Sequence, residues 1–208
     1  MMYRTLLLIS LGLTSMSASA QICNSANIQE STPSANFVTS IPLGRFPTLS
    51  PLLPDGSEIL DLTTGLVWQR CSVGQNWNQT LSRCEGLPTK FSWSDALMLN
   101  SSGSWRIPNI KQLTSIIDFR CQAPPLNPEI FPDTPASMFY TLFGSSTVYG
   151  TGYWSSTPNL SPDNTGNTVK IGAWVMDLDL GTPKLVSVEN NNPSISQQRH
   201  FVRLVRWQ

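Results

Sequence analysis

The feature that most constrains this chain is a set of four cysteines that follows a hydrophobic N-terminal stretch. Residues 1–20 carry one charged side chain, Arg4, then the apolar run Leu6–Leu13, and they end in Ala18-Ser19-Ala20. This order is typical of a cleaved secretory signal peptide, and no later apolar run has the length to span a bilayer. An even number of cysteines in an exported chain predicts two disulfides in an oxidising compartment.

The four cysteines allow three pairings, and their positions alone do not select one. We favour Cys71–Cys84, which would close a segment rich in Gln, Asn and Gly, together with Cys23–Cys121, which would tie the start of the chain to the domain. A metal site is the alternative. The spacings are wide and include no C-x-x-C pair, so we expect neither a metal nor another cofactor.

The charge balance argues against one class of partner. The chain has 13 basic and 13 acidic residues, and charged residues make up only 12% of it. A protein that binds nucleic acid through its phosphates needs an excess of Lys and Arg, so we expect no nucleic-acid partner. Uncharged polar residues take the place of charges, as is common on exported proteins.

Proline and glycine divide the rest of the chain. Residues 21–55 contain five prolines, which predicts an irregular Pro- and Ser-rich arm, and residues 56–208 form the domain. Two short apolar runs around Gly65 predict a β-hairpin. One helix is predicted from Ser92 to about Asn100. A second is predicted from Asn109 to about Asp118, with its apolar residues on one stripe.

Strands are predicted at 152–156, 172–178, 184–188 and 200–206. Two helices followed by strands predict an α+β domain with a mostly antiparallel, twisted sheet. The last segment is apolar on both faces, which favours a central strand. Arg203 and Arg206 lie in it, and we expect them to pair with carboxylates inside the protein.

Several ordered segments together resemble the C-terminal domain family of the Legionella collagen-like adhesin. They run from the Thr64–Cys71 segment through Gly74–Trp77, Cys84–Gly86, Phe91–Ala96, Trp105–Leu113, Asn127–Pro132 and Tyr153–Thr157 to Val202–Arg206. The resemblance implies a compact domain of C-type-lectin-like layout with its termini close together. It also implies ligand binding rather than catalysis, since the namesake domain binds sulfated polysaccharides. This neutral chain departs from that pattern, because binding a polysulfate needs a dense basic surface.

The residues we predict to bind ligand are loop residues. Trp77, flanked by Asn76 and Asn78, is predicted to stack on a sugar ring; the alternative is that Trp77 packs against the nearby disulfide. Asp163 and Asn164 lie on a second polar loop that could line the same kind of site. They supply too few oxygens for calcium, as do Asp177 and Asp179.

The other tryptophans are interpreted as structural. Trp68, Trp93 and Trp154 lie in predicted helices and strands and are expected in the core. Trp105 is also expected to be buried, and Arg106 is expected to bond backbone carbonyls at the start of the second helix.

The sequence predicts no enzyme. His200 is the only histidine, and a triad of Ser155 or Ser156 with His200 and Asp177 lacks the motif that such triads carry. We therefore predict an exported, non-catalytic domain that binds carbohydrate or acts in adhesion. The alternative is a structural subunit of a bacterial envelope assembly. The expected partner is an extracellular glycan or a surface protein, an oligomer is possible, and the expected location is the periplasm, the outer surface or the medium.

Overall fold

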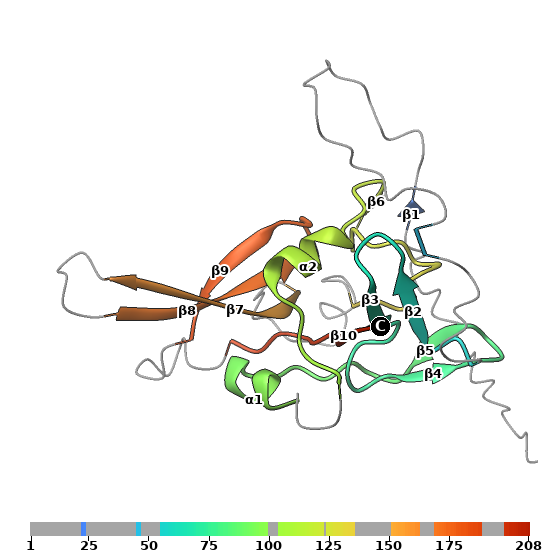
Figure 1. Ribbon diagram of the computed structural model, residues 1–208, viewed down its shortest axis with the longest axis horizontal. Coiled ribbons are helices and arrows are strands. Elements are labelled where there is room, and N and C mark those ends of the chain that lie inside the picture. The colour runs from blue at the N-terminus through green and yellow to red at the C-terminus, as the bar shows by residue number, and fades with distance from the viewer. Residues whose placement is uncertain are drawn as a thin grey trace, which may run out of the picture.

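The computed structural model describes residues 22–23, 45–46, 55–99, 104–122, 124–135, 151–162, 169–188 and 198–208. These residues form two short helices and several antiparallel sheets, so the predicted α+β class is confirmed (Figure 1). The strands are divided among four small sheets, where one twisted sheet was expected. The strands of the two three-stranded sheets are not hydrogen-bonded to one another in a continuous ladder, so no single sheet forms among the described residues.

The first three-stranded sheet contains the predicted hairpin. β2 (Glu58–Asp61) and β3 (Leu66–Gln69) pair in antiparallel fashion, and β10 (Val205–Trp207) pairs with the other edge of β3. Gly65, at a φ of 69°, lets the chain reverse between β2 and β3, because glycine adopts this backbone conformation without steric cost. The order β10-β3-β2 places residues from the two ends of the domain side by side.

The second three-stranded sheet follows the helices in the chain. β7 (Gly152–Pro162), β8 (Val169–Asp177) and β9 (Pro183–Ser187) pair in sequence order, with a bulge in β7 between Trp154 and Pro158. Figure 1 shows the β7–β8 pair extending away from the rest of the molecule. Two further pairs complete the fold, namely β1 (Ile22–Cys23) with β6 (Cys121–Gln122), and β4 (Asn76–Asn78) with β5 (Arg83–Glu85).

Both predicted helices form, and both begin at the predicted caps. The Ser92 side chain accepts the N–H of Asp95 at the start of α1 (Trp93–Met98). Asn109 and Gln112 form a capping box at the start of α2 (Ile110–Ser115), in which each side chain accepts the backbone N–H of the other residue. Both helices end earlier than predicted.

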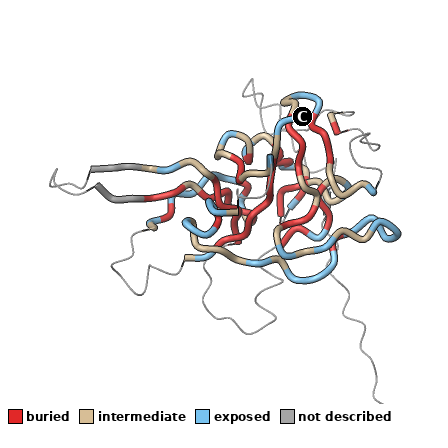
Figure 2. The backbone as a smooth tube through the Cα atoms, turned by 60° about the horizontal axis from the view of Figure 1, so that its bottom comes forward, coloured by how far each residue is buried: buried red, intermediate tan, exposed pale blue. Residues whose placement is uncertain are grey.

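The core consists of two clusters of buried side chains. Figure 2 marks the buried residues in red along the backbone. Trp68 and Phe131 lie in the larger cluster, between the first sheet and α2, whereas Trp154 lies in the smaller one beside the second sheet. Trp68 and Trp154 are fully buried, as predicted. Trp93 and Trp105 are only partly buried at the edge of the second cluster, so they pack against the core without entering it.

The prediction of one central strand over residues 200–206 is wrong. Only Val205–Trp207 form a strand, and β10 lies at the edge of its sheet. The preceding residues are buried because they bond to several different segments: Phe201 N–H donates to Gly152, while the carbonyls of Val202 and Leu204 accept from Val73 and Gln69. Apolar residues on both faces therefore reflect contacts with several segments, and not a place inside one sheet.

The two arginines of this segment differ. Arg206 pairs with Glu58 at 2.8 Å, as predicted. Arg203 is fully buried, and the prediction of a carboxylate partner is wrong. Its guanidinium donates to the carbonyls of Gln69 and Arg70 and to the hydroxyl groups of Thr134 and Tyr153.

Both favoured disulfides, Cys23–Cys121 and Cys71–Cys84, are present. Cys23–Cys121 joins β1 to β6, and Cys71–Cys84 joins the end of the first hairpin to β5. Among the helices of the described ranges, none has the length and apolar character needed to cross a bilayer.

Candidate functional site

The segment predicted to carry the ligand site is a β-hairpin, not a loop. Trp77 lies in β4 directly opposite Cys84 in β5, and the Cys71–Cys84 disulfide holds β5 to the domain. Asp133 adds a second anchor, since its carboxylate accepts the backbone N–H of Cys84 and pairs with Arg83. The hairpin is therefore fixed at its base.

The surroundings of Trp77 do not leave its ring free. Its indole N–H donates to the carbonyl of Asp55 at 2.7 Å, and the guanidinium of Arg70 lies 4.3 Å from the ring centroid. Arg70 is itself held by the backbone carbonyls of Gly56, Glu129 and Ile130, so it cannot easily leave the ring. Burial, and then the positive charge of Arg203, lower the pKa of Arg70 from its ordinary value.

The neighbours of Trp77 have different surroundings. Asn76 is exposed, whereas the Asn78 side chain accepts the N–H of Leu81 and so serves the turn of the hairpin. Asp163 and Asn164 lie outside the described residues. Trp77 is thus held in place by its contacts, and the sugar-stacking role predicted for it remains a prediction.

The carboxylates considered for calcium have structural partners. Asp177 accepts the backbone N–H groups of Asp179 and Leu180 and so holds the turn between β8 and β9. Asp179 accepts the hydroxyl group of Thr151. Within the described ranges, no group of three or more His, Cys, Asp or Glu side chains is arranged to hold a metal ion.

The triad considered for catalysis does not assemble. The Ser155 hydroxyl accepts the N–H of Thr157, and Asp177 serves its own turn. Neither ring nitrogen of His200 has a hydrogen-bond partner among the described residues. Burial lowers the pKa of His200 to about 3, and the nearby charges of Lys90 and Lys184 act in the same direction.

Because His200 is buried in its neutral form, we expect the free energy of unfolding to decrease in acid. An unfolded histidine takes up a proton near pH 6.5, whereas folded His200 stays neutral until about pH 3, so stability falls as the pH drops between these values. From pH 6.5 to 4.5 we expect His200 to contribute a loss of about 2–3 kcal/mol in the free energy of unfolding. Chemical denaturation at several pH values, repeated on His200→Phe, measures it. An equally steep loss in the variant would contradict this assignment.

An open groove lies on another face, between the C-terminal strand, the β2–β3 turn and α2. Its volume is about 370 Å³, within the range of small-ligand sites. The lining residues come from all three elements and are Thr64, Leu66, Asn109, Lys111, Gln112, Ser115 and Trp207. None of them belongs to the hairpin that carries Trp77.

Trp207 is the one aromatic side chain among the described residues that line this groove. Of the seven tryptophans, all within the described ranges, it is the only exposed one, with 60% of its surface accessible. Its backbone is fixed nonetheless, because β10 pairs with β3 so that Trp207 lies opposite Leu66. A large exposed ring on a fixed backbone can stack on a ligand without a large entropic cost.

The start of α2 supplies polar groups to the groove. The Gln112 side-chain oxygen accepts the N–H of Asn109 and a guanidinium N–H of Arg106 at 3.0 Å, and the Asn109 side-chain oxygen accepts the N–H of Gln112. Since both amide oxygens are engaged, the two NH₂ groups are left as donors. The described residues place no acceptor against these NH₂ groups or against Lys111.

The role predicted for Arg106 needs adjustment. It was expected to position the start of the second helix by bonding backbone carbonyls. Its main bond is instead to the Gln112 side chain of the capping box, with a longer contact to the carbonyl of Ile107. Its guanidinium also lies 5.6 Å from the Trp207 ring centroid, so Arg106 connects the helix cap to the groove tryptophan. Burial lowers its pKa from the ordinary value.

One known family matches most of the described domain. The family model described as the Lcl C-terminal domain matches residues 57–206, from β2 to the middle of β10. The chain belongs to this family. It matches no curated protein and no solved structure. The Lcl C-terminal domain is associated with a surface adhesin, and the two disulfides are consistent with export.

Sequence reasoning offers little ground for selecting Trp207. It lies one residue beyond the match to the Lcl C-terminal domain. Strand alternation places it on the same face as buried Arg203 and Val205, which would predict a buried ring. It is exposed because the chain segments that cover Arg203 and Val205 do not extend over the groove, and only the tertiary structure reveals this.

Proposed function

We propose that this Lcl C-terminal domain is an exported, non-catalytic binding domain of the cell surface or the medium, and that it binds carbohydrate in the groove beside Trp207. Exposure of this one tryptophan beside two amide donors and Lys111 is the observation that carries the proposal. An apolar ring face can stack on the apolar C–H face of a pyranose, and the few donors that share the groove can bond to its oxygens.

The groove supports this function better than the hairpin does. Each ring has an arginine neighbour, but Arg70 lies 4.3 Å from the centroid of Trp77, whose N–H is already bonded, whereas Arg106 lies 5.6 Å from that of Trp207, which keeps 60% of its surface accessible. A C-type-lectin-like layout is part of the same proposal. Its support is the pairing of β10 with β3, which brings the two ends of the domain together, and an experimental structure of the domain would test it.

Replacing Trp207 by alanine is expected to weaken glycan binding about five- to thirtyfold, since stacking on an aromatic ring contributes about 1–2 kcal/mol. Because Trp207 lies at the edge of its sheet and is mostly exposed, the free energy of unfolding should change by less than about 1 kcal/mol. A glycan array screen of the oxidised protein identifies the ligand, and calorimetric titration of each hit with both proteins measures the loss of affinity.

Trp77→Phe is the matched control, because it keeps a ring against Arg70 at a position remote from the groove. We expect it to bind as the wild type does. Loss of binding in Trp77→Phe but not in Trp207→Ala would show that the ligand binds at the β4–β5 hairpin and not in the groove. If no glycan binds, the structural-subunit function becomes the better explanation, and capture of an envelope partner becomes the next experiment.

A further inference from the structure

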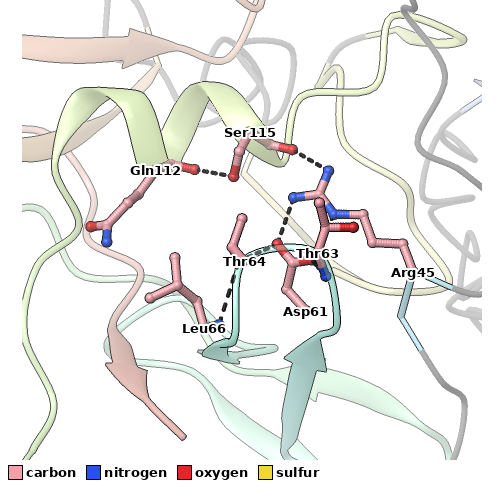
Figure 3. A network of polar contacts seen from close by, with 7 residues as sticks. All are labelled: Arg45, Asp61, Thr63, Thr64, Leu66, Gln112 and Ser115. Atoms are coloured by element: carbon pink, nitrogen blue, oxygen red, sulfur yellow. Dashed lines mark hydrogen bonds and ion pairs between the residues drawn. The ribbon is translucent and has the colours of Figure 1, made fainter.

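Arg45 lies twelve residues before the stretch that the family model matches, yet it bonds to Ser115, which lines the groove, and to Asp61, which in turn bonds to the lining residue Thr64. Its guanidinium makes two bonds to the carboxylate of Asp61, at 2.7 and 2.5 Å. A third N–H donates to the carbonyl of Ser115 at 2.8 Å. Figure 3 shows these contacts between the β2–β3 turn and the end of α2.

The first of these contacts leads directly to one wall. Besides Arg45, the Asp61 carboxylate accepts the hydroxyl group of Thr64 at 2.6 Å and the backbone N–H of Thr63 at 3.0 Å. Thr64 in turn lines the groove. Arg45 therefore orients the carboxylate that shapes the β2–β3 turn.

The second contact leads to the opposite wall. Ser115 is the last residue of α2 and also lines the groove. Carbonyls in the last turn of a helix lack partners within the helix, and a cation is favourable there. By binding the Ser115 carbonyl, Arg45 fixes the end of α2 relative to the β2–β3 turn.

The ion pair between Arg45 and Asp61 is suited to hold the β2–β3 turn in one geometry. The Asp61 side chain is fully buried and that of Arg45 is 9% exposed, so water does not compete for these bonds. Burial alone would raise the pKa of Asp61, but the bonds from Arg45 and Thr64 and the charge of Arg45 outweigh it, and this pKa lies below its ordinary value. Two parallel bonds from a planar guanidinium also fix an orientation, which a lysine ammonium cannot do.

Phe46, the residue after Arg45, is held to the domain by apolar contacts. Phe46 is 8% exposed, lies in the larger core cluster and packs edge-on against Phe131. Burial of Phe46 holds the segment to the domain without touching the groove, so the polar contacts of Arg45 serve a separate purpose.

From these contacts we infer that Arg45 is a positioning residue of the groove, so that a residue outside the stretch matched by the family model helps to shape the binding site. The inference rests on the proposed function for its effect on ligand affinity. Its geometric part, that Arg45 sets the placement of Thr64 and Ser115, stands independently of any ligand.

The test compares full-length Arg45→Met and Arg45→Lys with the wild type. NMR spectra report the backbone amides of Thr64 and Ser115, the Gln112 side-chain amide and the Trp207 indole N–H, which is identified by its absence from Trp207→Phe. We expect the first three resonances to shift in Arg45→Met while those of the β7–β9 sheet stay in place. In Arg45→Lys these three resonances should lie between their positions in Arg45→Met and in the wild type.

Arg120→Met is the matched control, because Arg120 makes the same kind of ion pair with a buried carboxylate, Asp118, shortly after α2. It does not line the groove. We expect Arg120→Met to lower the melting temperature without moving the groove resonances. If Arg45→Met does likewise, Arg45 is only an anchor of its segment, and the inference is wrong.

A second measurement uses the methyl glycosides of glucose, galactose and N-acetylglucosamine as probes of the Trp207 indole resonance. Arg45→Met should weaken any probe that shifts this resonance in the wild type by at least fivefold, whereas Arg120→Met should not. Unchanged probe affinity in Arg45→Met would overturn the inference. If no probe acts on the wild type, the proposed function fails for these sugars, and the groove resonances alone decide the role of Arg45.

Discussion

Replacing Cys23 and Cys121 together by serine is expected to lower the free energy of unfolding by about 4–5 kcal/mol. The two cysteines are 98 residues apart, and a crosslink across a loop of this length removes a large part of the chain entropy of the unfolded state. Cys121 is also 2% exposed, so its serine variant leaves a buried hydroxyl group in place of a sulfur atom. Denaturant unfolding of the oxidised wild type and of the double variant measures the difference.

The second disulfide gives an internal comparison. Cys71 and Cys84 are 13 residues apart and both buried, and the same model predicts a loss of about 3 kcal/mol for their double serine variant. Removing the crosslink across the longer loop should thus lower the free energy of unfolding by about 1.8 kcal/mol more. Equal losses, or a greater loss at Cys71–Cys84, would show that local packing outweighs loop entropy in this domain.

Replacing Arg203 by methionine is expected to lower the free energy of unfolding by about 3 kcal/mol. Methionine fills a similar length but donates no hydrogen bond, so the partly buried carbonyls of Gln69 and Arg70 lose this donor, at about 1–2 kcal/mol each. The hydroxyl groups of Tyr153 and Thr134 lose less, because Tyr153 stays bonded to Ser72 and Thr134 to Phe131.

One effect opposes this loss. The Arg203 guanidinium is fully buried, and its removal relieves the cost of taking a charge out of water. We expect the relief to be smaller, because the rings of Phe131 and Tyr153 lie 4.8 and 5.1 Å from the guanidinium and stabilise its charge.

Arg206→Met is the control for this prediction. Arg206 is partly exposed and bonded to Glu58, so its replacement should cost no more than about 1 kcal/mol. The comparison is made by denaturant unfolding under the same conditions. An Arg203→Met protein as stable as the wild type, or more stable, would mean that the desolvation of the guanidinium dominates.

Local signals were sufficient to predict the helices and the first hairpin. Ser92 and Asn109 cap the two helices as their sequence context predicts, and the glycine between the two short apolar runs forms the turn. The family resemblance likewise rests on short ordered motifs. These features depend on residues within a few positions of one another, which is why the sequence alone reveals them.

The burial of individual aromatic and charged side chains could not be predicted in the same way. Trp77 and Trp207 each have polar neighbours in the sequence, but Arg70 covers the first whereas 60% of the second is accessible. Arg203 and Arg206 are three residues apart, yet one binds carbonyls and hydroxyl groups and the other binds a carboxylate. The partners that distinguish the two arginines, such as Tyr153, Thr134 and Glu58, lie 50 or more residues away in the sequence.

The segment from Phe201 to Val205 has a consequence for when this domain can fold. Phe201 and Val205 belong to the larger core cluster, and Val202 and Leu204 belong to the smaller one. Neither cluster is complete until these residues have been synthesised, and the β3 partner of Val205, Trp68, lies more than 130 residues earlier. Contacts this distant in sequence form slowly, so we expect the domain to lack a complete core until this last segment has left the ribosome.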